Sequence, residues 1–151
     1  MFPDVFDPSF ATAPPVDIFS AGFPCQPFST EGRRLGVSDE RAHVIEPILR
    51  YMMACLPRAA MLENALGLLQ KENIDVAKTI IMVLQKIYHV FTKVLSSKDF
   101  GVPHHRERIY IIAIRRDVFT GTFQWPECVA CLPLLSFWKR KEQASRRRTR
   151  N

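Results

Sequence analysis

The sequence predicts an α/β fold in which helices pack on a central β-sheet. Short apolar runs of strand length alternate with amphipathic helical segments, in the order strand, helix, strand, helix, strand, strand. Glycine, proline and polar residues separate these segments. A chain of 151 residues, of which 47% are hydrophobic and 24% charged, is long enough for one domain with a real core.

The first predicted strand covers residues 16–19, with the sequence VDIF. It follows residues 1–15, which are rich in proline and phenylalanine and are expected to be irregular. Gly22 and Pro24 are expected to end the strand, because both residue types interrupt regular structure. Residues 29–39 are polar and contain two glycines, so a loop is expected there.

An amphipathic helix is predicted over residues 43–57, because apolar residues recur on one face of a 3.6-residue period. Pro47 is compatible only with the first turn of that helix. Residues 59–62, with the sequence AAML, form a second predicted strand. The polar residues Glu63 and Asn64 are expected to follow this strand.

The second half of the chain supplies one more helix and two strands. The apolar period predicts a helix over residues 74–87 and strands over residues 89–95 and 108–114. The last strand is almost continuously apolar, which indicates burial on both faces. Residues 118–138 show no clear period and remain unassigned.

Three polar clusters carry residues capable of chemistry on a flat heterocycle. Parallel strands of an α/β sheet place Cys25 and Glu63 beyond the same sheet edge, where ligands bind. A thiolate can add across a conjugated double bond, and a carboxylic acid can protonate a ring nitrogen. Arg106 and Arg108 offer guanidinium groups that hold carbonyl or phosphate oxygens.

Three segments resemble, in order and spacing, the signatures of the C5-cytosine DNA methyltransferase family. DIFSAGFPCQPFS resembles its Pro-Cys-Gln catalytic loop, MLENALGLL its Glu-Asn-Val element, and GVPHHRERIYIIAIRRD its Gly-Val-Pro-Gln-x-Arg-x-Arg element. The resemblance covers residues 16–117. It implies part of a Rossmann-like, S-adenosylmethionine-dependent methyltransferase fold.

The resemblance also implies a role for each catalytic candidate. Cys25 resembles the nucleophile that attacks C6 of cytosine, and Glu63 resembles the acid that contacts N3 and the exocyclic amine. Arg106 resembles the arginine that steadies the base, while Arg108 matches a second arginine with a more structural role. The family takes its methyl group from S-adenosylmethionine and acts on a base extruded from DNA. Taken singly, these residues are also typical of a buried thiol, a helix-terminal acid and surface ion pairs.

The sequence departs from the family pattern at the cofactor site. None of its six glycines is spaced to form the family's Phe-x-Gly-x-Gly loop, and no segment matches the target-recognition domain. Phe23, Pro24 and Asn64 are the cofactor-binding residues that the resemblance still implies. His104 replaces the glutamine of one signature, and Ala65 replaces the valine of another.

The missing first strands of the family fold predict an open sheet edge beside residues 16–19. Another chain or segment is expected to complete the sheet, and little or no methyl transfer is expected from this polypeptide alone. The leading hypothesis is a truncated DNA (cytosine-5-)-methyltransferase. Two alternatives stay open: a non-catalytic methyltransferase-like remnant that binds nucleic acid or a partner, and a tRNA cytosine-5 methyltransferase.

The net charge of +6 lies in the C-terminal tail, since residues 139–151 hold seven basic residues and one acidic residue. Such a tail binds phosphates, serves as a nuclear address or is simply solvated, so the charge alone does not establish a nucleic-acid partner. The N-terminus has acidic residues where a secretory signal has basic ones, and no apolar run approaches the ~20 residues of a membrane span. An intracellular location is expected, in the nucleus if the source is eukaryotic.

Cys128 and Cys131 form a Cys-x-x-Cys pair, but the sequence offers no second pair with zinc-ligand spacing. No metal site is therefore expected. The four histidines show no convergent metal spacing either. A thiol-redox enzyme ranks last among the hypotheses, because the pair has no strand–turn–helix context.

Overall fold

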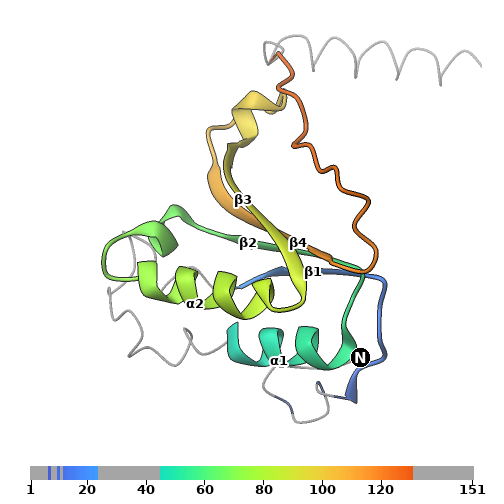
Figure 1. The fold of residues 1–151 in the computed structure, drawn as a ribbon. Coiled ribbons are helices and arrows are strands. Elements are labelled where there is room, and N and C mark those ends of the chain that lie inside the picture. Colours follow the sequence, from blue (N-terminus) through green and yellow to red (C-terminus); the bar gives the residue numbers. More distant parts are fainter. Residues whose placement is uncertain (1–6, 8–9, 11, 24–44, 131–151) are drawn as a thin grey trace, which may run out of the picture. The chain divides into compact units, whose positions relative to one another are not determined.

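The computed structural model describes residues 7, 10, 12–23 and 45–130, and it shows a four-stranded sheet with two α-helices (Figure 1). The chain divides into two compact units, and the helices and most of the sheet belong to the first, residues 1–94 and 108–122. The elements in chain order are β1 (Ile18–Gly22), α1 (Ile45–Cys55), β2 (Ala59–Asn64), α2 (Ile74–Gln85), β3 (Tyr88–Ser96) and β4 (Glu107–Arg115), with a short 3-10 helix at Leu66–Leu69.

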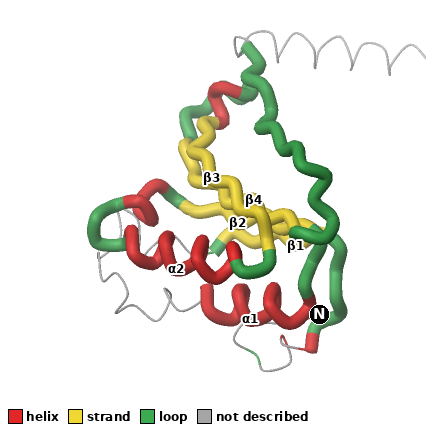
Figure 2. The backbone as a smooth tube through the Cα atoms, in the orientation of Figure 1, coloured by secondary structure: helices red, strands yellow, loops and turns green. Residues whose placement is uncertain are grey.

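The strand order in the sheet is β1-β2-β4-β3 (Figure 2). Strand β1 runs parallel to β2, and the register joins Ile18 to Ala59 and Gly22 to Glu63. Strand β4 lies antiparallel to β2, with Asn64 opposite Ile109. The predicted α/β class is thus confirmed, and β1 and β2 end at the same sheet edge.

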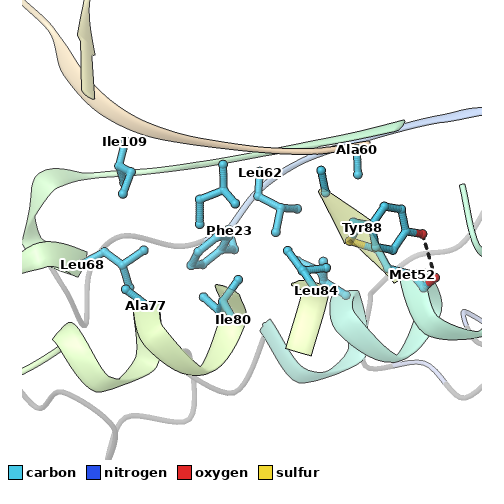
Figure 3. Close-up of a cluster of buried hydrophobic side chains, with 13 residues drawn as sticks. Phe23, Met52, Ala60, Leu62, Leu68, Ala77, Ile80, Leu84, Tyr88 and Ile109 are labelled. Carbon is cyan, nitrogen blue, oxygen red and sulfur yellow. Dashed lines mark hydrogen bonds between the residues drawn. The ribbon is translucent and has the colours of Figure 1, made fainter. Parts of the chain in front are cut away.

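The hydrophobic core lies between one face of the sheet and the two helices (Figure 3). Alternate residues of β2 and β4 point into it, as a strand period of two requires. The hydroxyl of Tyr88 donates to the Met52 carbonyl oxygen at 3.4 Å, and burial raises the pKa of this phenol. The labelled core residues are Phe23, Met52, Ala60, Leu62, Leu68, Ala77, Ile80, Leu84, Tyr88 and Ile109.

The opposite face of the sheet is more exposed among the described residues. Ile18 is 75% exposed and Met61 is 40% exposed. On β4, Ile111 and Ala113 are buried, whereas the residues between and beside them are only partly buried. The prediction that residues 108–114 are buried on both faces is therefore wrong for the described part of the chain, because both described helices pack on one face.

Helices α1 and α2 and strands β3 and β4 confirm the predicted elements, whereas the bounds of strands β1 and β2 differ from the prediction. Strand β1 begins later than predicted and continues through Gly22, and β2 includes Glu63 and Asn64. The physical reason is the ladder of backbone hydrogen bonds with the neighbouring strands, which outweighs the local preference of glycine and polar residues for turns. The predicted loop at residues 29–39 lies outside the described residues.

The segment before β1 is anchored on α1. The hydroxyl of Tyr51 donates to the Pro14 carbonyl oxygen at 2.8 Å, and burial raises the pKa of Tyr51. The Tyr51 ring also lies 5.2 Å from the Phe10 ring and 5.1 Å from the Phe19 ring, centroid to centroid. These contacts tie the N-terminal segment and β1 to one side of the helix.

The C-terminal end of α1 is joined to the end of β4 through Arg115. Leu56 follows the helix with a φ of 49°, and its carbonyl oxygen accepts a hydrogen bond from the Arg115 guanidinium. The same guanidinium holds both oxygens of Asp117, with Nε–Oδ1 at 2.7 Å and the second contact at 3.0 Å. Arg115 lowers the pKa of the Asp117 carboxyl through these hydrogen bonds.

The Arg115–Asp117 ion pair is expected to make a pH-dependent contribution to the free energy of unfolding. A carboxyl whose pKa is lower in the folded state stabilises the fold above its unfolded pKa of about 3.9, and that contribution is lost as the pH falls through the folded pKa. The free energy of unfolding, measured with urea, should therefore be higher for the wild type than for Asp117→Asn at pH 6. The difference between the two proteins should be smaller below pH 3. In an Arg115→Gln background the gap should depend less on pH, because the backbone hydrogen bonds to Asp117 still lower its pKa. An equal gap at both pH values in the wild-type background would contradict the assignment.

The second unit comprises residues 95–107 and 123–151 and contains the connection from β3 to β4. Backbone hydrogen bonds fix this connection: the Ser97 amide donates to the Arg106 carbonyl oxygen at 3.0 Å and the Val129 amide to the Asp99 carbonyl oxygen at 2.7 Å. Gly101 has a φ of 78°, a conformation that L side chains rarely adopt. None of the helices in the described ranges has the length and apolar character needed to cross a membrane.

Candidate functional site

The predicted site residues divide between described and undescribed parts of the chain. Glu63, Asn64 and Arg108 lie in strands of the first unit, and Phe23 directly follows β1. Arg106 belongs to the second unit, where its side chain is exposed. The predicted nucleophile Cys25 and the neighbouring Pro24 lie outside the described residues.

The centre of the described site is an ion pair between Glu63 and Arg108. Arg108 Nε lies 3.1 Å from Glu63 Oε1, and the two side chains are only 22% and 26% exposed, respectively. Glu63 stands opposite Tyr110 in the antiparallel register, so Arg108 is its diagonal neighbour on the same face of the sheet. Two residues that were predicted from separate signatures are thus in direct contact.

The pair lies at the edge where the parallel strands end. Glu63 is the penultimate residue of β2, and its partner in the register is Gly22, the last residue of β1. Cys25 comes three residues after Gly22 in the sequence. The chain that carries the predicted nucleophile therefore leaves the sheet beside the carboxylate, as expected for a ligand site at the carboxyl ends of the strands.

Gly22 is the site residue that the sequence prediction missed. A Cβ atom built on it would lie 3.2 Å from Glu63 Oε2, which is closer than ordinary van der Waals contact. The sequence prediction gave Gly22 only the role of a strand breaker. Aligning the ends of the two predicted strands would have placed Ser20 opposite Glu63, so only the observed register brings Gly22 next to it.

Asn64 points away from the ion pair, because successive strand residues face opposite sides of the sheet. It is 1% exposed, and its Oδ1 accepts a hydrogen bond from the Ala65 amide at 2.7 Å. Its Nδ2 has no hydrogen-bond partner among the described residues. A buried amide donor without a partner is costly, so this group is suited to bind an acceptor from elsewhere.

Phe23 is a core residue, 5% exposed, and packs within the hydrophobic cluster (Figure 3). Of the predicted cofactor-binding residues that the structure describes, Asn64 thus offers a buried donor, whereas Phe23 belongs to the core. A sulfonium-bearing nucleoside also needs partners for its charged amino-acid part and its ribose, which these residues do not supply. Asn64 and Phe23 by themselves therefore do not form a complete S-adenosylmethionine site.

The remaining cysteines do not form a metal centre within the described ranges. Cys128 is exposed and Cys55 is half-buried, and no group of three potential ligands gathers in this part of the structure. Cys131 lies outside the described residues, so the geometry of the Cys-x-x-Cys pair stays untested.

The fold matches that of known methyltransferases. A crystal structure of the Schizosaccharomyces pombe Dnmt2 methyltransferase superposes with a TM-score of 0.53 at 27% sequence identity, over 71% of this chain and 32% of that one. The chain thus has part of a methyltransferase fold, as the sequence predicted.

Family membership follows from the sequence comparison. The C-5 cytosine-specific DNA methylase family matches residues 4–133, which is most of the chain. This protein belongs to that family.

The curated relatives are much longer than this chain. The type II methyltransferase M.HaeII of Haemophilus aegyptius is 44% identical over 112 residues, covering 74% of this chain and 35% of its own length. M.NlaX of Neisseria lactamica is 39% identical over 126 residues, covering 82% of this chain and 39% of its own length. The chain therefore spans little more than a third of either relative. Both are bacterial proteins, so they give no support to a nuclear location.

Proposed function

We propose that this chain carries the cytosine-activating part of a DNA (cytosine-5-)-methyltransferase, with residues 16–117 as a partial catalytic core. The observation that carries the proposal is the Glu63–Arg108 ion pair at the carboxyl edge of β1 and β2. Strand β1 ends at this edge, and the chain continues from it to Cys25. Residues 118–138 remain unassigned in this proposal, and residues 139–151 form a basic tail.

In the proposed reaction, the thiolate of Cys25 adds to C6 of an extruded cytosine, and the ring electrons move towards C5. In its protonated form the Glu63 carboxyl group donates to N3 and accepts from the exocyclic amine, which makes the ring more electrophilic. Arg106 holds the base, and Arg108 holds the carboxylate of Glu63 in place. S-adenosylmethionine, the methyl donor in this family, would supply the methyl group that C5 accepts. Loss of the C5 proton and departure of the thiolate return the enzyme to its starting state.

Arg108 is assigned a positioning role because its Nε already contacts the carboxylate. A charge-assisted hydrogen bond between a guanidinium and a carboxylate fixes direction as well as distance. The pair is more than one-fifth exposed on each side, so its contribution to folding is expected to be modest. Its importance would lie in the orientation of Glu63 towards a bound base.

We further propose that another chain or segment completes the sheet beside β1. Ile18 lies on this terminal strand of the described sheet and is 75% exposed, and Met61 on the same face is 40% exposed. Burying such side chains contributes roughly 25 cal/mol for each Å² of apolar surface removed from water.

The test compares the 151-residue chain with a chimera in which residues 16–117 replace the matching segment of M.NlaX. Methyl transfer from tritiated S-adenosylmethionine to DNA is measured for both. We expect little or no transfer by the chain alone and clear transfer by the chimera. A folded chimera without transfer would sink the proposed function, and robust transfer by the chain alone would refute the need for a completed sheet.

The same methyl-transfer assay, with DNA or tRNA as substrate, distinguishes the two alternative functions. Transfer to tRNA but not to DNA by the chimera would favour a tRNA cytosine-5 methyltransferase. A non-catalytic remnant would show no transfer to either substrate. The exposed terminal strand β1 is the observation that keeps this second alternative open.

A further inference from the structure

The missing side chain at Gly22 leaves room for the carboxylate of Glu63. We infer that Gly22 is a positioning residue, which sets the orientation of Glu63 by admitting Oε2 close to the β1 backbone. The catalytic meaning of this role rests on the proposed function, whereas the geometric role does not.

The two oxygens of the Glu63 carboxylate have different neighbours, and they move together because the carboxylate is rigid. Oε1 of Glu63 lies 3.1 Å from Arg108 Nε, and Oε2 lies 3.2 Å from the position of a Cβ at residue 22. A methyl group there would need a few tenths of an ångström of extra space. Moving Oε2 away also rotates Oε1, so the contact with Arg108 must lengthen or turn.

Backbone conformation does not explain a glycine at this position. Among the described glycines, only Gly101 and Gly121 have the positive φ that disfavours other residues. Gly22 is hydrogen-bonded in a strand, where glycine is less favourable than alanine by roughly 0.5–1 kcal/mol. Gly22→Ala should therefore leave the fold intact or slightly strengthen it. Among the described residues, Glu63 is the neighbour that a side chain at residue 22 would meet, and this contact favours glycine.

The test uses the Nε–H resonance of Arg108 in ¹H–¹⁵N spectra of the full chain, assigned by its loss in Arg108→Lys. This resonance reports the hydrogen bond to Glu63 directly and requires no methyl transfer. We expect Gly22→Ala to move it towards its position in Glu63→Gln, without lowering the urea midpoint of unfolding. Ser20→Ala is the matched control, because Ser20 precedes Gly22 by two residues on the same face and pairs with Met61.

An Arg108 resonance that is the same in Gly22→Ala as in the wild type would overturn the inference. So would an equal shift in Ser20→Ala, since that control leaves the Glu63 contact unchanged. If Gly22→Ala does not fold, Gly22→Ala combined with Glu63→Asp decides the matter. Shortening the acid withdraws its oxygens from the new methyl group, so folding should return; an equally unfolded double variant would refute the role of the contact.

Because this readout does not depend on catalysis, the two proposals fail separately. A chimera without methyl transfer bears on the proposed function alone. An Arg108 resonance that does not change in Gly22→Ala bears on the positioning role alone.

Discussion

Replacement of Cys25 by alanine should reduce methyl transfer by the chimera at least about 10³-fold, since loss of a nucleophile removes the covalent route altogether. Without addition at C6, C5 of cytosine has too little electron density to accept a methyl group. The measurement is the initial rate of tritium transfer to DNA. Cys55→Ala is the matched control, because Cys55 lies in α1, half-buried, with its Sγ 3.8 Å from the Ala13 carbonyl oxygen.

The covalent step can be isolated with DNA that contains 5-fluorocytosine. Fluorine replaces the hydrogen that must leave from C5 after methyl transfer. With S-adenosylmethionine present, the thiol adduct should therefore accumulate as a band that survives denaturation. We expect this band with the unsubstituted chimera and with Cys55→Ala, but not with Cys25→Ala. A band that persists in Cys25→Ala would show that another residue is the nucleophile.

Replacement of Leu62 by alanine should lower the free energy of unfolding by about 2–5 kcal/mol, as expected for a large-to-small change in a close-packed core. Leu62 is completely buried in β2, between Ala21 of β1 and Ile111 of β4 in the register. The loss would be a large part of a typical domain's stability of about 5–15 kcal/mol. Urea unfolding followed by circular dichroism measures it.

Met61→Ala is the matched control, because Met61 is the adjacent residue on the opposite and more exposed face of the same strand. It should cost less than about 1 kcal/mol in the chain alone. A cost as large as that of Leu62→Ala would mean that the second face is already covered in solution. That result would contradict the exposure of Met61 in the structure.

Element types were predictable wherever the apolar period was clear. The period of α2 and the apolar runs of β3 and β4 depend on local sequence, and the structure confirms them. Strand ends were less predictable, as Gly22 and Glu63 show. Both residues disfavour strands in isolation, yet backbone hydrogen bonds to a neighbouring strand keep them in the ladder.

The sequence by itself determined the family signatures and therefore the residue types available for chemistry: a thiol, a carboxylate and two guanidiniums. It did not determine which of them touch. Only the tertiary structure, in which β4 lies antiparallel beside β2, brings Arg108 against Glu63. The parallel register of β1 likewise places Gly22 under the same carboxylate. Strand order and register arise from long-range pairing, and a shift of one residue would turn these side chains to opposite faces of the sheet.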